Sequence, residues 1–140
     1  MKIARGILSL ALLASALVGI QILVNDRWLW SAAPSHAYGL IGFVAVNVIL
    51  AVAVLRIGFA SMAAAMMAAV QFGAMLADIV AGQPDGVPSV AFRSYLLSDV
   101  SYLGLLAIQI AILSVAIGTL TTRLAHSHGH WTQFLRHQRR

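Results

Sequence analysis

The sequence predicts an all-α integral membrane protein, a bundle of four transmembrane helices. Three observations support this fold class. Of the 140 residues, 61% are hydrophobic and only 9% are charged, a composition unlike that of ordinary soluble domains. The stretch from Gly39 to Ala81 contains only Arg56 and Asp78 as charged residues. At about 1.5 Å per residue, this stretch is about twice too long for one crossing and must turn back. Apolar runs from Gly6 to Val24 and from Leu96 to Leu120 flank it, and each is long enough to cross once.

We therefore expect spans at about residues 6–25, 36–56, 59–81 and 96–121. The first apolar run is longer than the apolar region of a cleavable signal peptide, so we expect it to stay as a span. A tight turn at Arg56-Ile57-Gly58 separates the second span from the third, and Gly58 supplies the backbone freedom for it. Residues 1–122 would form the bundle, and residues 123–140 a basic, histidine-rich cytoplasmic tail.

The two connections on the other side are longer, from Asn25 to Ser35 and from Gly82 to Tyr95. Ser35 is predicted to be the N-cap of the second span. Aromatic residues gather near these connections and are typical of a membrane-interface belt. They are Trp28, Trp30, Tyr38 and Tyr95.

The distribution of cations predicts the orientation. Seven of the nine Lys and Arg residues fall before the first span, in the turn at Arg56, or after the fourth span. The positive-inside rule makes this side cytoplasmic, with both termini inside. Arg27 and Arg93 fall on the opposite side. The expected location is the cell (plasma) membrane, and the net charge of +5 is better explained by topology and anionic lipid than by nucleic acid.

The third span has a small residue at every fourth position, which predicts a helix-packing seam. The seam consists of Ser61, Ala65, Ala69, Gly73, Ala77 and Ala81. Small side chains allow close approach of helix backbones, which drives association in lipid. The partner is expected to be the fourth span, although the same pattern would also suit another subunit.

Polar residues inside the spans form a predicted intramembrane cluster. Asn47, Gln71 and Gln109 fall near mid-membrane in three different spans, and Asp78 lies about one turn inside the outer boundary. Amides at such depth either bond one helix to another or line a path for a polar solute or ion. Asp78 is expected either to pair with Arg93 or Arg27, or to handle a proton or cation.

The tail supports two interpretations. The H-x-H-x-H pattern has the composition of a divalent-metal site, with candidate ligands His126, His128 and His130. Apolar residues at helical spacing among arginines instead predict an amphipathic segment on the inner leaflet. Its lipid contacts would be Arg123, Trp131, Arg136, Arg139 and Arg140.

The function expected from these features is that of a non-catalytic accessory subunit of a larger membrane complex, such as a respiratory or redox complex. The chain has no cysteine and no glutamate, and no arrangement of catalytic residues or glycine-rich phosphate loop is evident. No cofactor is predicted, and His36 alone cannot provide two axial haem ligands. The expected partners are the lipid bilayer and other membrane subunits or further copies of the chain. The alternatives are a small transporter or channel with a path along the polar cluster, and a metal-responsive protein that uses the tail. The size and four-span layout are similar to those of DoxX-type small membrane proteins.

Overall fold

The computed structural model describes the backbone of residues 2–82, 84 and 86–137, and the side chains of these residues as far as 121. Every regular element in these ranges is an α-helix, which confirms the all-α fold class. The helices are α1 (Lys2–Asn25), α2 (Arg27–Ala32), α3 (Pro34–Arg56), α4 (Ala60–Ala81), α5 (Ser89–Ser98) and α6 (Val100–His137). Four of them are long and apolar enough to cross a membrane: α1, α3, α4 and the Val100–Thr121 part of α6.

Two predicted helix starts are wrong. The fourth span begins at Val100 rather than at residue 96, because the chain bends at Asp99, where the backbone is extended. The Asp99 carboxylate accepts a hydrogen bond from the backbone N–H of Ser101 at 2.8 Å, which satisfies a free donor at the start of α6. Ser35 is not the N-cap of α3. Ala33 takes that position and Pro34 begins the helix, where its missing N–H and restricted φ are favourable.

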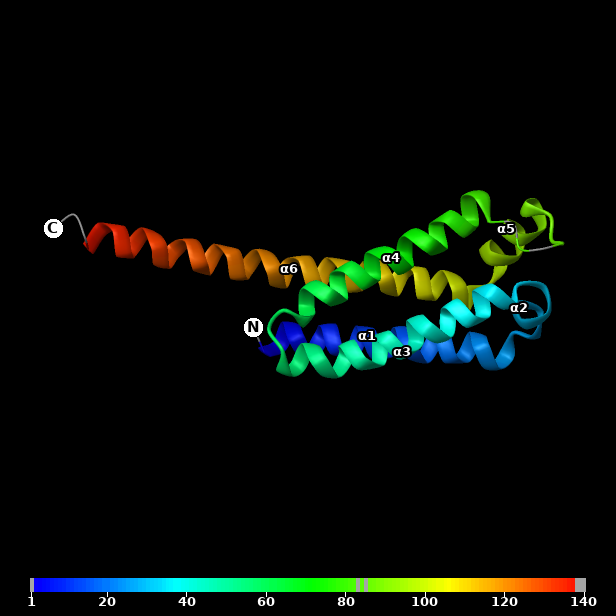
Figure 1. The fold of residues 1–140 in the computed structure, drawn as a ribbon, viewed down its shortest axis with the longest axis horizontal. Helices are drawn as coiled ribbons and strands as arrows, with labels where there is room; N and C mark the ends of the chain where they lie inside the picture. Colours follow the sequence, from blue (N-terminus) through cyan, green and yellow to red (C-terminus); the bar gives the residue numbers. More distant parts are fainter. Residues whose placement is uncertain (1, 83, 85, 138–140) are drawn as a thin grey trace.

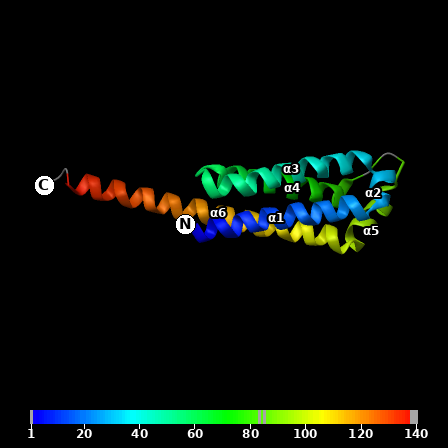
Figure 2. The same cartoon turned by 90° about the horizontal axis from the view of Figure 1, so that it is seen from below.

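The four long helices form two antiparallel pairs (Figures 1 and 2). In one pair α3 packs along α1, and in the other α4 packs along α6; α1 and α6 then join the two pairs. The N-terminus and the α3–α4 turn lie at one end of the bundle, here called the hairpin end. Helices α2 and α5 lie at the opposite end, here called the short-helix end.

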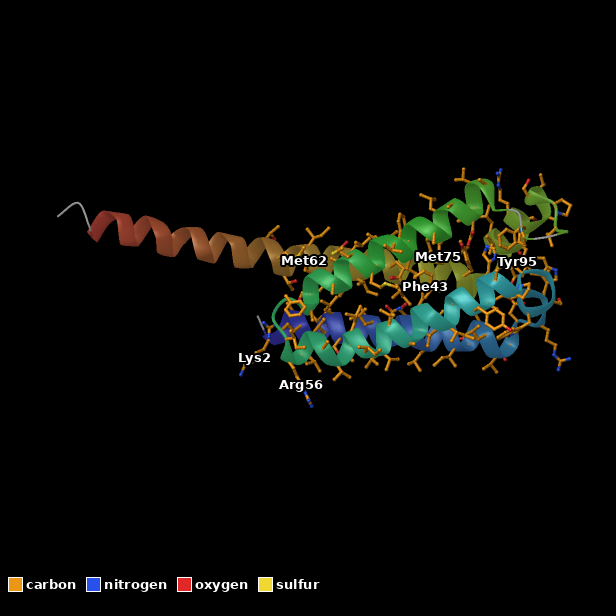
Figure 3. The ribbon with its side chains drawn as sticks, in the orientation of Figure 1. Lys2, Phe43, Arg56, Met62, Met75 and Tyr95 are labelled. Carbon is orange, nitrogen blue, oxygen red and sulfur yellow. The ribbon has the colours of Figure 1, made fainter. Side chains whose placement is uncertain are left out.

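The positions of the labelled cations fit the predicted topology. Lys2 and Arg56 lie together at the hairpin end, and Tyr95 lies at the short-helix end (Figure 3). In an up-and-down bundle, residues before the first span and residues between the second and third spans lie at the same end, as Lys2 and Arg56 do. The orientation in a membrane, with both termini inside, stays a prediction.

The core has two parts. In the hairpin half, leucines of α1 form a cluster with alanines of α3, α4 and α6 and with Val54 and Ile112. Small residues let the helix backbones approach closely. Farther along α1, toward the short-helix end, Gly19 also lies close to α3, because a Cβ built there would lie 2.6 Å from Val44 Cγ2. At the short-helix end, the core side chains are larger, and they include Leu29, Phe92 and Leu96 from the two short helices. The short helices thus cover this end of the bundle.

Candidate functional site

A buried polar network joins all four long helices at their middle. Asn47 Nδ2 on α3 donates to Ser15 Oγ on α1 at 2.9 Å and to Gln71 Oε1 on α4 at 3.2 Å. Gln109 Nε2 on α6 donates to the same Ser15 hydroxyl oxygen at 2.7 Å. None of these four residues is more than 2% exposed. The network therefore fixes how the four helices are rotated against one another.

The structure brings together three of the four residues of the predicted intramembrane cluster and adds Ser15, which the sequence reasoning missed. The position of Ser15 midway along α1 is the one sequence signal that could have indicated its membership of the network. A serine in a helix usually bonds a carbonyl of the preceding turn, so this signal is weak. A fully buried atom of the network lacks a protein partner: no described group donates to Gln109 Oε1.

Asp78, the fourth predicted member, lies nearer the short-helix end and pairs with His36 on α3. His36 Nε2 lies 3.1 Å from Asp78 Oδ1, and both side chains are partly exposed, at 29% and 26%. The expected pair of Asp78 with Arg93 or Arg27 is wrong. Arg93 instead donates from Nε and Nη2 to two carbonyl oxygens near the C-terminus of α4, at 2.7 and 2.8 Å. Those carbonyls lack helical partners and carry the negative end of the helix dipole, so they attract the guanidinium.

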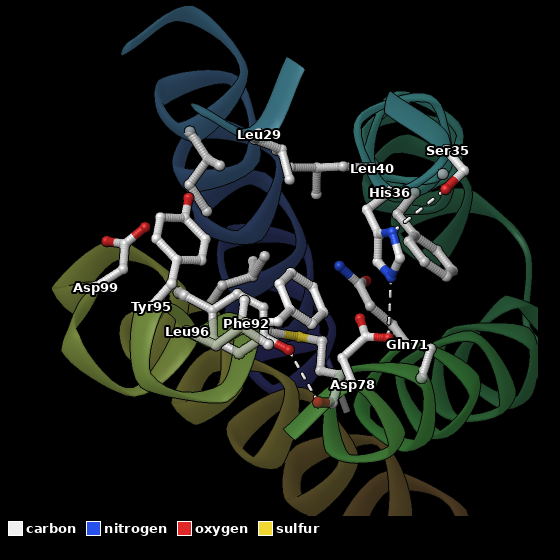
Figure 4. Close-up of a pocket in the computed structure, with 17 residues that line it drawn as sticks. Leu29, Ser35, His36, Leu40, Gln71, Asp78, Phe92, Tyr95, Leu96 and Asp99 are labelled. Atoms are coloured by element: carbon white, nitrogen blue, oxygen red, sulfur yellow. Dashed lines mark hydrogen bonds and ion pairs between the residues drawn. The ribbon is translucent and has the colours of Figure 1, made fainter. Parts of the chain in front are cut away.

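A cavity of about 370 Å³ opens beside the His36–Asp78 pair, between the two helix pairs. Figure 4 shows the pair on one side of the cavity and Asp99 and Tyr95 on the other, with Phe92 between them. Most of the lining is apolar or aromatic. The lining residues are Ile22, Leu29, Ser35, His36, Gly39, Leu40, Phe43, Gln71, Ala74, Met75, Asp78, Phe92, Tyr95, Leu96, Asp99, Tyr102 and Leu105.

Aromatic rings from the short helices build one wall of this pocket. The ring of Trp28 lies over that of Tyr95 with a centroid distance of 4.0 Å, and over that of Phe92 at 6.1 Å. Phe92 also meets the His36 ring edge-on at 5.2 Å. Gly82 permits this arrangement, because a Cβ there would lie 2.8 Å from the Phe92 ring and would also meet the backbone of α4. The Trp and Tyr expected in a membrane-interface belt thus also pack against each other around the pocket.

Gln71 connects the pocket to the buried network. Its side chain lines the cavity, and its Oε1 accepts the hydrogen bond from Asn47. Toward the hairpin end, the core beyond the network consists mostly of Leu, Ile, Val and Ala side chains, together with the buried serines Ser9 and Ser61. Among the described residues, the polar side chains of the site therefore gather between the short-helix end and mid-bundle, and the core beyond them is mostly apolar.

The predicted packing seam lies mostly on the outside of the bundle. Ser61 is buried and Ala65 half-buried, but Ala69, Gly73, Ala77 and Ala81 are exposed. With about 3.6 residues per turn, a residue at every fourth position moves around the helix by about 40° per step. A line that begins on the buried face of α4 therefore leaves it within two or three steps. Helix α4 does pack along α6, and its buried face consists of residues spaced by three and four, including Ser61, Ala64, Ala68, Gln71 and Met75.

The predicted tail sites lie beyond the described side chains. His126, His128 and His130, and also Arg123, Trp131 and Arg136, lie on the backbone of α6, but their side chains are outside the described part. Arg139 and Arg140 lie outside the described residues altogether. In the part that is described, no three His, Asp or Glu side chains gather as metal ligands would. The metal and lipid interpretations of the tail stay predictions.

Comparison of the chain with protein-family models, with curated proteins and with solved structures gives no match. The pocket and the polar network are therefore the features of the molecule that bear on its function.

Proposed function

We propose that this chain is a non-catalytic membrane protein that binds a small amphipathic molecule in the pocket at the short-helix end. The observation that carries the proposal is a mostly apolar cavity of about 370 Å³ with the His36–Asp78 pair in its wall. Binding pockets for small molecules are typically about 300–1,000 Å³, largely apolar, with a few converging polar groups. The apolar lining would hold the body of the ligand, and the His36–Asp78 pair its polar head.

The geometry favours binding over conduction. A transporter or channel would need polar groups or water along the whole bundle. The amides of the buried network are bonded to one another or to Ser15 across four helices, and the core beyond the network is mostly apolar in the described residues. This arrangement supports a pocket that is closed at its base.

The proposal is tested by native mass spectrometry of the protein, released from the membranes of the cells that produce it. Gly39 lines the pocket, and a Cβ there meets no atom within 4 Å, so Gly39→Leu should place its side chain in the cavity. Gly42 lies on the same helix with equally open space but does not line the cavity. We expect a bound small molecule on the wild type and on Gly42→Leu, and its loss from Gly39→Leu. A wild type without any bound molecule, or equal occupancy in both variants, would refute the proposal.

A second candidate function, compatible with the first, is that of an accessory subunit in a larger membrane complex. It is favoured by the exposed part of the small-residue line on α4, which ends with Ala77 and Ala81. Small residues on a lipid-facing surface allow another helix to approach closely. Gly73 is central to this line, and a Cβ there meets nothing within 4 Å. Gly73→Leu should therefore leave the bundle intact but release the chain from a larger complex on a native gel, whereas Gly42→Leu should not. A wild-type chain that migrates alone would reject the subunit role.

A further inference from the structure

The pocket lining is acidic, with His36 as its one residue that can carry positive charge when protonated. Its lining includes the carboxyl groups of Asp78 and Asp99, the imidazole of His36, and no Lys or Arg among the seventeen lining residues. The nearby Arg93 guanidinium is bonded to carbonyl oxygens at the end of α4. The chain as a whole carries +5, so this acidic pocket stands out against a basic protein.

The two carboxyl groups have different tasks. Asp99 Oδ1 accepts from the N–H of Ser101 at the start of α6, which gives Asp99 a structural role. In the described part of the chain, the Asp78 carboxyl is hydrogen-bonded only by His36, through Oδ1. The second oxygen, Oδ2, keeps its capacity to accept a hydrogen bond or to face a cation. A carboxylate within a membrane-spanning helix requires such compensation.

Aromatic rings make up much of the apolar lining of this pocket. The lining holds four of them, Phe43, Phe92, Tyr95 and Tyr102, in addition to His36. The faces of aromatic rings attract organic cations, and more strongly where water is excluded. An apolar cavity with aromatic walls and a carboxylate oxygen that no described group bonds, Asp78 Oδ2, suits a cation with an apolar body better than a neutral or anionic molecule.

We propose that the ligand of this pocket is a lipophilic organic cation, an amine or quaternary ammonium compound, with its charged head at Asp78 and its apolar body among the aromatic rings. This inference rests on the proposed function, because it names the ligand class of the same pocket. It goes further in assigning the head-group site to Asp78 rather than to Asp99.

The test is equilibrium dialysis of the full chain in nanodiscs of zwitterionic lipid, against two probes of the same shape. Benzyltrimethylammonium is the cation, and neopentylbenzene is its neutral carbon isostere. After correction for uptake by empty nanodiscs, we expect the cation to bind at least about tenfold more tightly. Asp78→Asn should remove this preference, whereas Asp99→Asn should keep it within about twofold. Gly39→Leu should weaken the binding of both probes, and Gly42→Leu should weaken neither.

The possible failures are distinguishable. Equal binding of the two probes that is lost in Gly39→Leu would overturn the cation assignment and leave the pocket function intact. A preference that is lost in Asp99→Asn and kept in Asp78→Asn would overturn the assignment to Asp78. Binding of neither probe would also overturn the cation proposal, and the native mass spectrometry described above would still decide independently whether the pocket binds a ligand. If Asp78→Asn does not fold, Asp78→Ser and Gly39→Leu in the same assay keep the test open. Asp78→Ser also removes the charge and should likewise remove the preference for the cation, and a preference that stays within about twofold of the wild type would contradict the proposal.

Discussion

Replacing Asn47 or Gln109, two of the three amides of the buried network, by leucine should have different effects on stability. Asn47→Leu removes two hydrogen bonds, to Ser15 and to Gln71. Interhelical hydrogen bonds in membrane proteins contribute about 0.6 kcal/mol each, and leaving the buried Gln71 Oε1 without its donor adds about 1–3 kcal/mol. We expect the free energy of unfolding to fall by about 2–4 kcal/mol.

Gln109→Leu should be neutral or stabilising. It removes one hydrogen bond, to Ser15, at a cost of about 0.6 kcal/mol. It also removes the Oε1 atom, which is buried and accepts no hydrogen bond from a described protein group. Burying such an oxygen costs about 1–3 kcal/mol. We therefore expect the free energy of unfolding to stay unchanged or to rise by up to about 2 kcal/mol.

The assay is reversible unfolding in mixed micelles, with SDS as the denaturant and far-UV circular dichroism as the signal, extrapolated linearly to zero SDS. Gln21→Leu serves as the control, because Gln21 is exposed on α1 and should change stability by less than about 0.5 kcal/mol. Equal destabilisation by Asn47→Leu and Gln109→Leu would refute the reasoning. It would mean that Gln109 Oε1 is satisfied in the folded protein, for example by an ordered water.

Three further predictions concern the packing and the helix ends. Gly19→Ala should lower the free energy of unfolding by about 1–3 kcal/mol, because its Cβ would lie 2.6 Å from Val44 Cγ2. Gly73→Ala should not lower the free energy of unfolding, because a Cβ there meets no atom within 4 Å. The same SDS titration measures both variants. Arg93→Ala removes two hydrogen bonds to carbonyl oxygens of α4. It should therefore speed amide hydrogen exchange in the last turn of α4 and lower the free energy of unfolding by about 1 kcal/mol. Unchanged exchange in that turn would contradict the capping role of Arg93. Asp26→Ala removes the N-cap of α2 and should lower the free energy of unfolding by about 1 kcal/mol. Asp26→Asn keeps a side-chain acceptor and should lower it clearly less. Equal losses of stability in the two variants would exclude capping as the cause.

Much of the architecture could be predicted because it depends on local properties. The length and apolarity of each run determine how many helices can span a membrane. The four predicted spans correspond to α1, α3, α4 and the first part of α6. The predicted start of the fourth span was wrong because the last residues of α5, from Leu96 on, continue into the apolar run of α6. The hydropathy averaged over a segment does not reveal a bend that one side-chain hydrogen bond supports.

The candidate site was less accessible to sequence reasoning. The mid-membrane amides were identified from depth alone, and the structure places Asn47, Gln71 and Gln109 in one network. The partner of Asp78 was not found, because opposite charge pointed to an arginine. In the structure, the cation that is close in sequence binds helix carbonyls, and a histidine 42 positions away takes the pair.

The sequence by itself determined an all-helical chain with four helices able to span a membrane, their order along the chain, and the depth of its polar residues. These follow from composition and period, which are properties of each segment alone. Only the tertiary structure decided which face of α4 is buried, that Ser15 is the centre of the polar network, and that a pocket opens beside His36 and Asp78. Each of these depends on how helices rotate and cross, which is set by close packing and hydrogen bonds between segments distant in the chain.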